Sequence, residues 1–136
     1  MEVIIFNGPG HLVMWLVKMY EVKVITIYGI KNCDTVKKTF KWFDDHDVTY
    51  VFHDYKKQGV DEDVLKRAID IHGWETVINK RGTTWRKLPL EVQESMNTTQ
   101  ALSIARENAS LIKRPLIVSD EGIHIGYDVD AFAKMA

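Results

Sequence analysis

A strand, a helix and a second strand follow one another early in the chain, and this order constrains the fold more than any other feature. Residues Val22–Tyr28 are rich in β-branched side chains, which favour a strand. Asp34–Asp45 carries apolar residues at three- and four-residue spacing, which predicts a helix. Val48–His53 alternates apolar and polar residues and predicts a second strand. Strands joined through a helix are parallel, with a right-handed crossover.

The middle of the chain is patterned as helices, and it separates this unit from a later pair of strands. Asp54–Gly59 is polar and predicts a loop. Asp61 is placed to cap a helix, and Thr98 or Thr99 is placed to cap another that runs to Asn108. Positions 61–108 therefore form a predicted helical block.

The last part of the chain predicts a hairpin and a final helix. Leu116–Ser119 and Ile123–Ile125 are apolar runs separated by a turn, and a helical pattern follows from Tyr127. The order predicts an α/β fold, a thioredoxin-like four-stranded mixed sheet with an inserted helical block. We expect this domain to span residues 22–136, with the insertion at about 61–108.

Residues 1–21 form an N-terminal extension that allows two interpretations. Its apolar run, Leu12–Val17, is far too short to span a membrane. The run could pack on the domain, or it could belong to a leader with no fold of its own. Because the strand–helix–strand unit is complete without it, we expect deletion of Met1–Lys18 to leave folding nearly intact.

Composition excludes several classes of protein. The 136 residues are 46% hydrophobic and 27% charged, as in an ordinary soluble domain, and the net charge of -1 favours neither nucleic acid nor an anionic membrane as a partner. A single cysteine cannot form an internal disulfide, so we expect a cytoplasmic protein. The five histidines lack metal-ligand spacing, so no metal site is expected.

Cys33, the single cysteine, lies where the first predicted strand gives way to the first predicted helix. Unpaired N–H groups and the helix dipole favour a negative group there, so the cysteine tends towards the nucleophilic thiolate. Lys31, Lys37 and Lys38 add positive charge, which Asp34 opposes.

The alternative is a buried and inert cysteine, because free cysteine is among the most buried residue types. The neighbours Gly29, Asn32 and Asp34 are turn and cap residues, which argue against a packed core position. The spacing alone leaves both interpretations open.

Two arginines could face Cys33 in this topology. Arg114 and Pro115 immediately precede the third strand, in a position beside the start of the first helix, and we predict a cis peptide bond between them. Arg81 comes from the loop before residue 83. A guanidinium binds carboxylates and oxyanions in a bidentate manner. Taken alone, each arginine could equally be a solvated surface charge.

Four segments together resemble the arsenate reductase-related family, and most of all its YffB-type branch. That family also contains Spx-type transcription regulators. The resemblance extends in the same order from about Val24 to the end of the chain and does not include Met1–Lys18. The segments are Tyr28–Thr35, Phe52–Gly59, Asn79–Leu88 and Ile112–Pro115.

The resemblance implies a thioredoxin-like fold with a helical insertion, and a cysteine that acts with glutathione. Cys33 matches the family's nucleophile, and Arg114 and Arg81 match two of the three arginines that hold the oxyanion in arsenate reductases. The third arginine has no counterpart, and Tyr28-Gly29 replaces the family's His-Asn pair, so the resemblance does not extend to arsenate itself.

We therefore expect a glutathione-dependent thiol reductase with a single nucleophilic cysteine. Glutathione is a co-substrate, no cofactor is bound, glutaredoxin is a further candidate partner, and the protein is expected to be a monomer. With no second cysteine, an external thiol must resolve the intermediate. The expected catalytic residue is Cys33, and the expected substrate or glutathione site consists of Arg81, Arg114, Lys31, Asn32 and Pro115.

The competing class is an Spx-like transcription regulator that binds RNA polymerase and is not an enzyme. Such regulators commonly carry a Cys-x-x-Cys switch, but Val36 occupies the second position here. This difference makes the regulator less favoured without removing it. A third possibility is a scaffold that keeps the fold and has no turnover.

Overall fold

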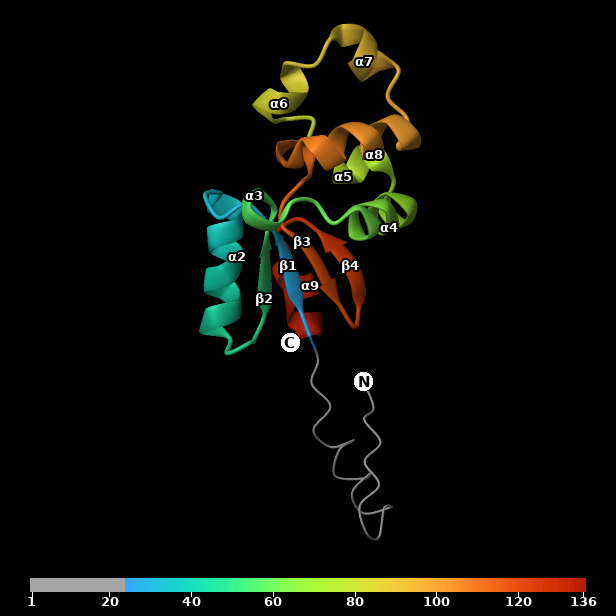
Figure 1. Cartoon of the computed structure of the whole chain (residues 1–136). Helices are drawn as coiled ribbons and strands as arrows, with labels where there is room; N and C mark the ends of the chain where they lie inside the picture. The colour runs from blue at the N-terminus through green and yellow to red at the C-terminus, as the bar shows by residue number, and fades with distance from the viewer. Residues whose placement is uncertain (1–23) are drawn as a thin grey trace.

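The computed structural model describes residues 24–136 of the chain (Figure 1). The predicted extension at 1–21, the expected effect of deleting Met1–Lys18 and the first two residues of the predicted first strand lie outside the described residues.

A four-stranded mixed sheet forms the centre of the fold, as the sequence predicts, and its strands lie in the order β2-β1-β3-β4. β1 (Thr26–Gly29) pairs in parallel with β2 (Val51–Asp54). On its other side β1 pairs antiparallel with β3 (Leu116–Ser119), and β3 pairs antiparallel with β4 (Gly122–Ile125). β1 therefore contacts both halves of the chain.

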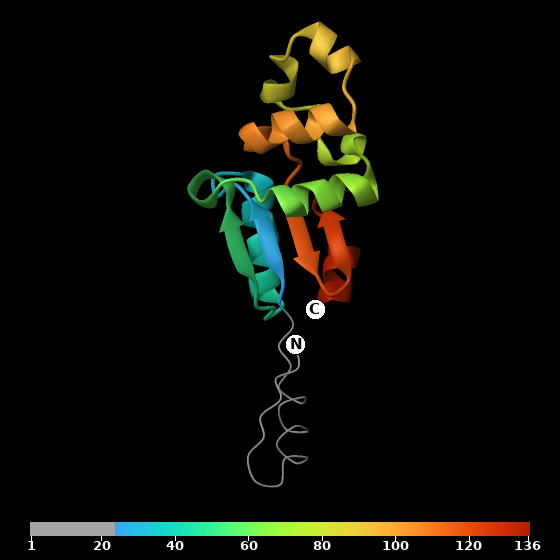
Figure 2. The same ribbon diagram turned by 45° about the vertical axis from the view of Figure 1, so that its right-hand side comes forward.

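Helices cover both faces of the sheet. α2 (Asp34–Asp45) and α9 (Val129–Met135) lie on one face, where Phe43 and Phe132 pack in a fully buried cluster with strand residues. α4 (Glu62–His72) lies across the upper end of the other face, with α2 and α9 behind the sheet (Figure 2). Leu65 of α4 packs there in a second buried cluster. The two clusters form the core of the domain.

The helical block lies beyond the end of the sheet where β1 and β2 terminate (Figure 1). It ends in a short 3-10 helix, η1 (Ala109–Leu111), which leads back to β3. A bridge between Ile78 and Ile112 ties the block to the segment that enters β3. The remaining helices of the block are α5 (Trp74–Val77), α6 (Thr83–Arg86), α7 (Leu90–Glu94) and α8 (Thr98–Glu107).

Several predicted elements have the expected bounds. α2 spans Asp34–Asp45 and β3 spans Leu116–Ser119, as the pattern indicates. The Arg114–Pro115 peptide bond is cis, as predicted. Asp61 caps α4 by accepting a hydrogen bond from the Val64 N–H at 3.2 Å.

The prediction of a polar loop at Asp54–Gly59 is wrong. Asp54 ends β2, and its carboxylate accepts the Lys56 N–H at 3.0 Å and so caps a short helix, α3 (Tyr55–Gln58). Tyr55 is only 5% exposed. The surrounding lysines made the segment look uniformly polar, whereas the tyrosine ring turns into the core.

Some other boundaries also differ. α8 is capped by Asn97, whose side-chain oxygen accepts the Gln100 N–H at 2.8 Å, and not by Thr98 or Thr99. An asparagine just before the helix satisfies this N–H, so the threonines become helical. β1 begins at Thr26 and β2 at Val51, later than the apolar patterns indicate. The helix α7 carries no buried residue, so its pattern gave no signal.

Gly29 allows α2 to pack closely on the end of β1. A β-carbon added at Gly29 would lie 2.8 Å from Cγ2 of Val36, whose side chain is fully buried. Real β-carbons essentially never approach another atom so closely. The absence of a side chain at Gly29 therefore sets the distance between the strand and the first turn of α2.

We expect Gly29→Ala to destabilise the protein by about 1–3 kcal/mol, the usual cost of overpacking. Urea denaturation would measure the change in the free energy of unfolding. The matched control is the double variant Gly29→Ala/Val36→Ala, whose cost should be clearly less than the sum of the two single costs. Strict additivity would contradict the proposed clash.

Candidate active site

Three segments distant in sequence meet at one edge of the sheet. Gly29 at the end of β1 pairs with Asp54 at the end of β2, so the segments that follow these strands leave from the same edge. β3 runs antiparallel to β1, with Leu116 paired to Tyr28, so the residues before β3 reach that edge as well. The carboxyl ends of parallel strands are the usual position of binding sites in open α/β sheets.

Cys33 is the N-cap residue of α2. Its backbone is extended, with φ -141° and ψ 123°, and its carbonyl accepts the Lys37 N–H at 2.9 Å as the first bond of the helix. The side chain is partly exposed. The helix therefore presents its unpaired N–H groups to the sulfur, as the position in the sequence predicts.

The pKa of the Cys33 thiol is lowered relative to its ordinary value. Burial alone raises this pKa, but the backbone N–H groups of Val36 and Thr35 and the nearby guanidinium of Arg114 favour the thiolate and outweigh the effect of burial. The lysines of the loop and of the first helical turn are not among the groups that shift it. The helix N–H groups and Arg114, which the sequence analysis placed beside Cys33, are the groups that lower the pKa of the thiol.

Arg114 is held next to Cys33 by the backbone that enters β3. Its Nη1 donates a hydrogen bond of 3.3 Å to the carbonyl of Ser110. Its Nε is buried, with no hydrogen-bond partner among the described residues. Pro115, which follows it, is buried, and its carbonyl accepts the Gly126 N–H at 2.8 Å. The guanidinium thus keeps a free donor beside the thiol.

Arg81 lies on an exposed loop of the helical block. The antiparallel bridge between Ile78 and Ile112, and a 2.7 Å bond from the Asn79 N–H to the Leu111 carbonyl, lead this loop past η1. Arg114 bonds to Ser110 in the same short helix. The two arginines thus belong to adjoining segments, but Arg81 is not among the groups that shift the pKa of Cys33.

Lys31 and Asn32 are exposed in the loop between β1 and α2, directly before Cys33. No hydrogen bond from either side chain to another described residue is present. Cys33 and Arg114 are the two predicted site residues that lie near enough for the guanidinium to lower the pKa of the thiol. Lys31 and Asn32 directly precede Cys33 in the chain, and Pro115 directly follows Arg114.

Tyr55 is a residue at this edge that the sequence analysis missed. Burial raises the pKa of its hydroxyl, as does the neighbouring Tyr28, whose ring centroid is 6.3 Å away, while Arg114 opposes the shift. Burial also raises the pKa of Tyr28. Both rings are therefore neutral walls of the edge near physiological pH. An aromatic residue directly after a strand was the available signal.

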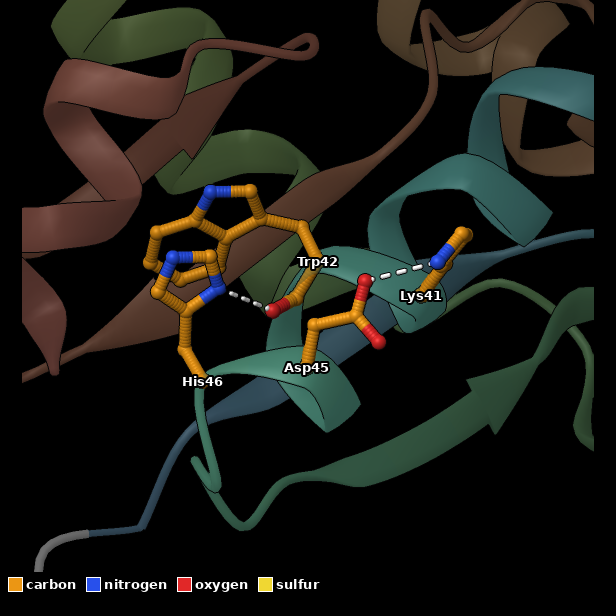
Figure 3. Close-up of polar contacts among 4 residues, drawn as sticks. All are labelled: Lys41, Trp42, Asp45 and His46. Atoms are coloured by element: carbon orange, nitrogen blue, oxygen red, sulfur yellow. Dashed lines mark hydrogen bonds and ion pairs between the residues drawn. The ribbon is translucent and has the colours of Figure 1, made fainter.

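The opposite end of α2 has a different role. Lys41 pairs with Asp45 at 2.7 Å, and His46 donates from Nδ1 to the Trp42 carbonyl at 2.7 Å while its ring stacks on the indole (Figure 3). These contacts close the last turn of the helix. They lie at the end away from Cys33, so they stabilise the element that carries the thiol and do not contribute to the site.

Residues 24–136 contain no cluster of three or more histidine, cysteine, aspartate or glutamate side chains suited to a metal ion. In the same range, every helix is too short or too polar to cross a membrane.

Comparison with known proteins identifies the class. The sequence pattern of the ArsC family matches residues 28–135, so the chain belongs to the ArsC family, which includes arsenate reductases and has a thioredoxin-like fold. A solved structure of a YffB protein is 40% identical with a TM-score of 0.77, covering 82% of this chain and 97% of its own.

Two curated relatives extend the comparison. An uncharacterized protein of Haemophilus influenzae is 49% identical over 105 residues, which is 77% of this chain and 92% of that protein. The global transcriptional regulator Spx of Staphylococcus epidermidis is 25% identical over 113 residues, covering 82% of this chain and 86% of its own. The family thus includes proteins with more than one kind of function.

The lowered pKa of Cys33 can be tested by the pH dependence of iodoacetamide alkylation. The midpoint for the folded protein should lie below that of the same protein unfolded in urea, because helix N–H groups and Arg114 stabilise the thiolate. Arg114→Met should move the midpoint upward. A folded-state midpoint at or above the unfolded one would contradict the assignment.

The same shift has a defined sign for stability. Because the folded-state pKa is the lower one, ionisation of Cys33 stabilises the folded protein fully above the unfolded pKa. This stabilisation is lost as the pH falls through the folded-state pKa.

Proposed function

We propose that this protein is a glutathione-linked thiol reductase in which Cys33 is the nucleophile. The observation that carries the proposal is the helix-capping thiol whose pKa is lowered by backbone N–H groups and by Arg114. A thiolate at ordinary pH and a partly exposed sulfur are the two requirements for thiol–disulfide exchange.

The proposed reaction is the reduction of a mixed disulfide between glutathione and a second thiol. The Cys33 thiolate attacks the glutathionyl sulfur, a new disulfide forms between Cys33 and glutathione, and the substrate leaves as a thiolate that takes a proton from solvent. A second glutathione, as its thiolate, then attacks the glutathionyl sulfur. Oxidised glutathione is released and the Cys33 thiolate is restored. Each cycle therefore consumes one glutathione thiol, and the other half of the oxidised glutathione is the glutathionyl group of the substrate.

The remaining expected site residues have binding roles in this proposal. Arg114 stabilises the thiolate, and its partly exposed guanidinium is proposed to bind a carboxylate or another anion. Arg81, from the adjoining loop, is proposed as a second anion-binding group. Lys31, Asn32 and the backbone at Pro115 complete the proposed glutathione site. Glutaredoxin is a further candidate partner.

An Spx-like regulator is the second candidate, favoured by the similarity to the Staphylococcus epidermidis Spx. Its weakness lies at Val36, the position of the second cysteine of a Cys-x-x-Cys switch. Val36 is fully buried against Gly29 and supplies no thiol. Co-purification with RNA polymerase, together with an unreactive Cys33, would favour the regulator.

Incubation with oxidised glutathione should add one glutathionyl group to the wild-type protein. Intact-mass measurement would detect the adduct, and reduced glutathione should remove it, because the resolving thiol is external. Cys33→Ser is the matched control and should acquire no adduct. An unmodified wild-type protein at pH values above the alkylation midpoint would refute the proposed function.

Replacing Arg114 with lysine should lower reductase activity by about 10- to 100-fold, the effect of losing a hydrogen bond to a charged group. Lysine keeps the positive charge but loses the planar fork. Arg86→Lys is the matched control, because Arg86 is an exposed arginine of α6 with no expected role. Turnover of a glutathione mixed disulfide measures both variants, and equal activities would contradict the role of Arg114.

A further inference from the structure

Exposed lysines surround the edge of the sheet where Cys33 lies. They come from separate segments that converge there: the loop before α2, the first part of α2, the short helix α3, and the approach to β3. All are exposed. We call this group the basic rim, and it consists of Lys31, Lys37, Lys38, Lys56, Lys57 and Lys113.

The basic rim has no internal neutralisation within residues 24–136. The ion pairs of that range join Lys41 to Asp45, and Arg106 to Glu62 and Glu107. No carboxylate of the described residues lies within 4.0 Å of a rim ammonium. The positive charge of the rim is therefore available to a partner.

The carboxylates nearest to the rim are mostly committed to backbone groups. Asp54 is buried and accepts the Lys56 N–H. Asp61 accepts the Val64 N–H as the cap of α4. Asp34, in the first turn of α2, and Asp128, shortly after β4, are exposed acids of this edge. A hydrogen bond to a backbone N–H leaves a carboxylate charged, so these four acids offset part of the charge of the six ammonium groups and leave the rim net positive.

Acidic residues gather at the opposite end of the domain. Asp44, Asp45 and Asp47 lie at the end of α2, and Asp120 and Glu121 form the turn between β3 and β4. Both places lie at the end of the sheet away from the helical block (Figure 1). The net charge of -1 therefore conceals a separation of charge along the sheet.

Free glutathione does not account for so much positive charge. Its carboxylates can be bound by the two arginines of the proposed site, and its own ammonium group is repelled by further cations. The rim draws its six ammonium groups from α2, α3 and the two loops that enter α2 and β3. The anionic surface of a larger partner could pair with all of these ammonium groups. Long-range attraction would also raise the rate at which such a partner meets the thiol.

We propose that the basic rim docks an acidic protein segment that carries the glutathionylated cysteine on which Cys33 acts. The chemistry of this inference rests on the proposed function, and the recognition of the acidic segment rests on the basic rim. The step is the exchange already described, with the acidic protein as the thiol that leaves. Lys38 lies over the Tyr127 ring at 4.2 Å, so this aromatic ring beside the rim is less free to stack on a base, which favours a protein.

Binding can be measured separately from chemistry with the Cys33→Ser variant. The probe is a fluorescent peptide with a glutathionylated cysteine flanked by aspartate and glutamate, and its control carries asparagine and glutamine instead. The acidic peptide should bind at least about tenfold more tightly at about 20 mM salt, and the difference should shrink at about 200 mM. Equal affinities at low salt would overturn the proposal.

A matched pair of lysines tests the location of the site. Lys57 and Lys134 are both exposed and both lie in the last turn of a short helix, α3 and α9. Lys134 borders the turn at Asp120 and Glu121, at the acidic end. Lys57→Glu should weaken binding of the acidic peptide about three- to tenfold, and Lys134→Glu should leave it unchanged. Equal weakening would show a net-charge effect and overturn the rim.

Two further measurements separate the possible failures. Turnover of a small uncharged disulfide with glutathione tests the proposed function alone, and Lys57→Glu should leave it unchanged. Preferred binding of the acidic peptide without such turnover would refute the reductase and support the rim. A single-stranded oligonucleotide that binds more tightly than the acidic peptide would overturn the choice of a protein partner.

Discussion

The pairing of β1 with two different strands is the constraint on which the rest of the structure depends. Because β1 pairs in parallel with β2 and antiparallel with β3, the ends of β1 and β2 and the beginning of β3 lie at the same edge of the sheet. Cys33 and Arg114 are 81 positions apart in the numbered sequence, yet they interact there. The close approach of α2 at Gly29 then sets the position of the helix N-terminus that holds the thiol.

The electrostatics of the site act over two ranges. The Val36 and Thr35 N–H groups and the Arg114 guanidinium lower the pKa of the Cys33 thiol by more than burial raises it. The lysines around the edge do not, because charges in solvent are screened over distances of about 8–10 Å. Local donors therefore control the reactivity of the thiol, whereas the lysines are suited to steering and holding a charged partner. This division explains why the net charge of the chain says so little about the site.

The helical block completes the edge through one short contact. The bridge between Ile78 and Ile112 lays the loop that carries Arg81 beside the segment that leads to Arg114. The buried tyrosine of α3 closes the same edge from the β2 side. The insertion is therefore part of the environment of the site as well as a cover for one face of the sheet.

The sequence alone determined the order of strands and helices, the bounds of α2 and β3, the helix-capping position of Cys33 and the cis bond before β3. These features depend on local periodicity, caps and proline chemistry, which act over a few residues. Tertiary structure decided what local patterns do not encode. Tyr55 became a core residue because its ring packs against Tyr28 from another strand, and Asn97 rather than a threonine capped α8 because its side chain reached the free N–H of Gln100. The sequence named Arg114 and Arg81 as the arginines that could face Cys33, and the tertiary structure decided between them, because strand pairing brings the residue before β3 to the edge where the thiol lies and Arg114 alone of the two lowers its pKa.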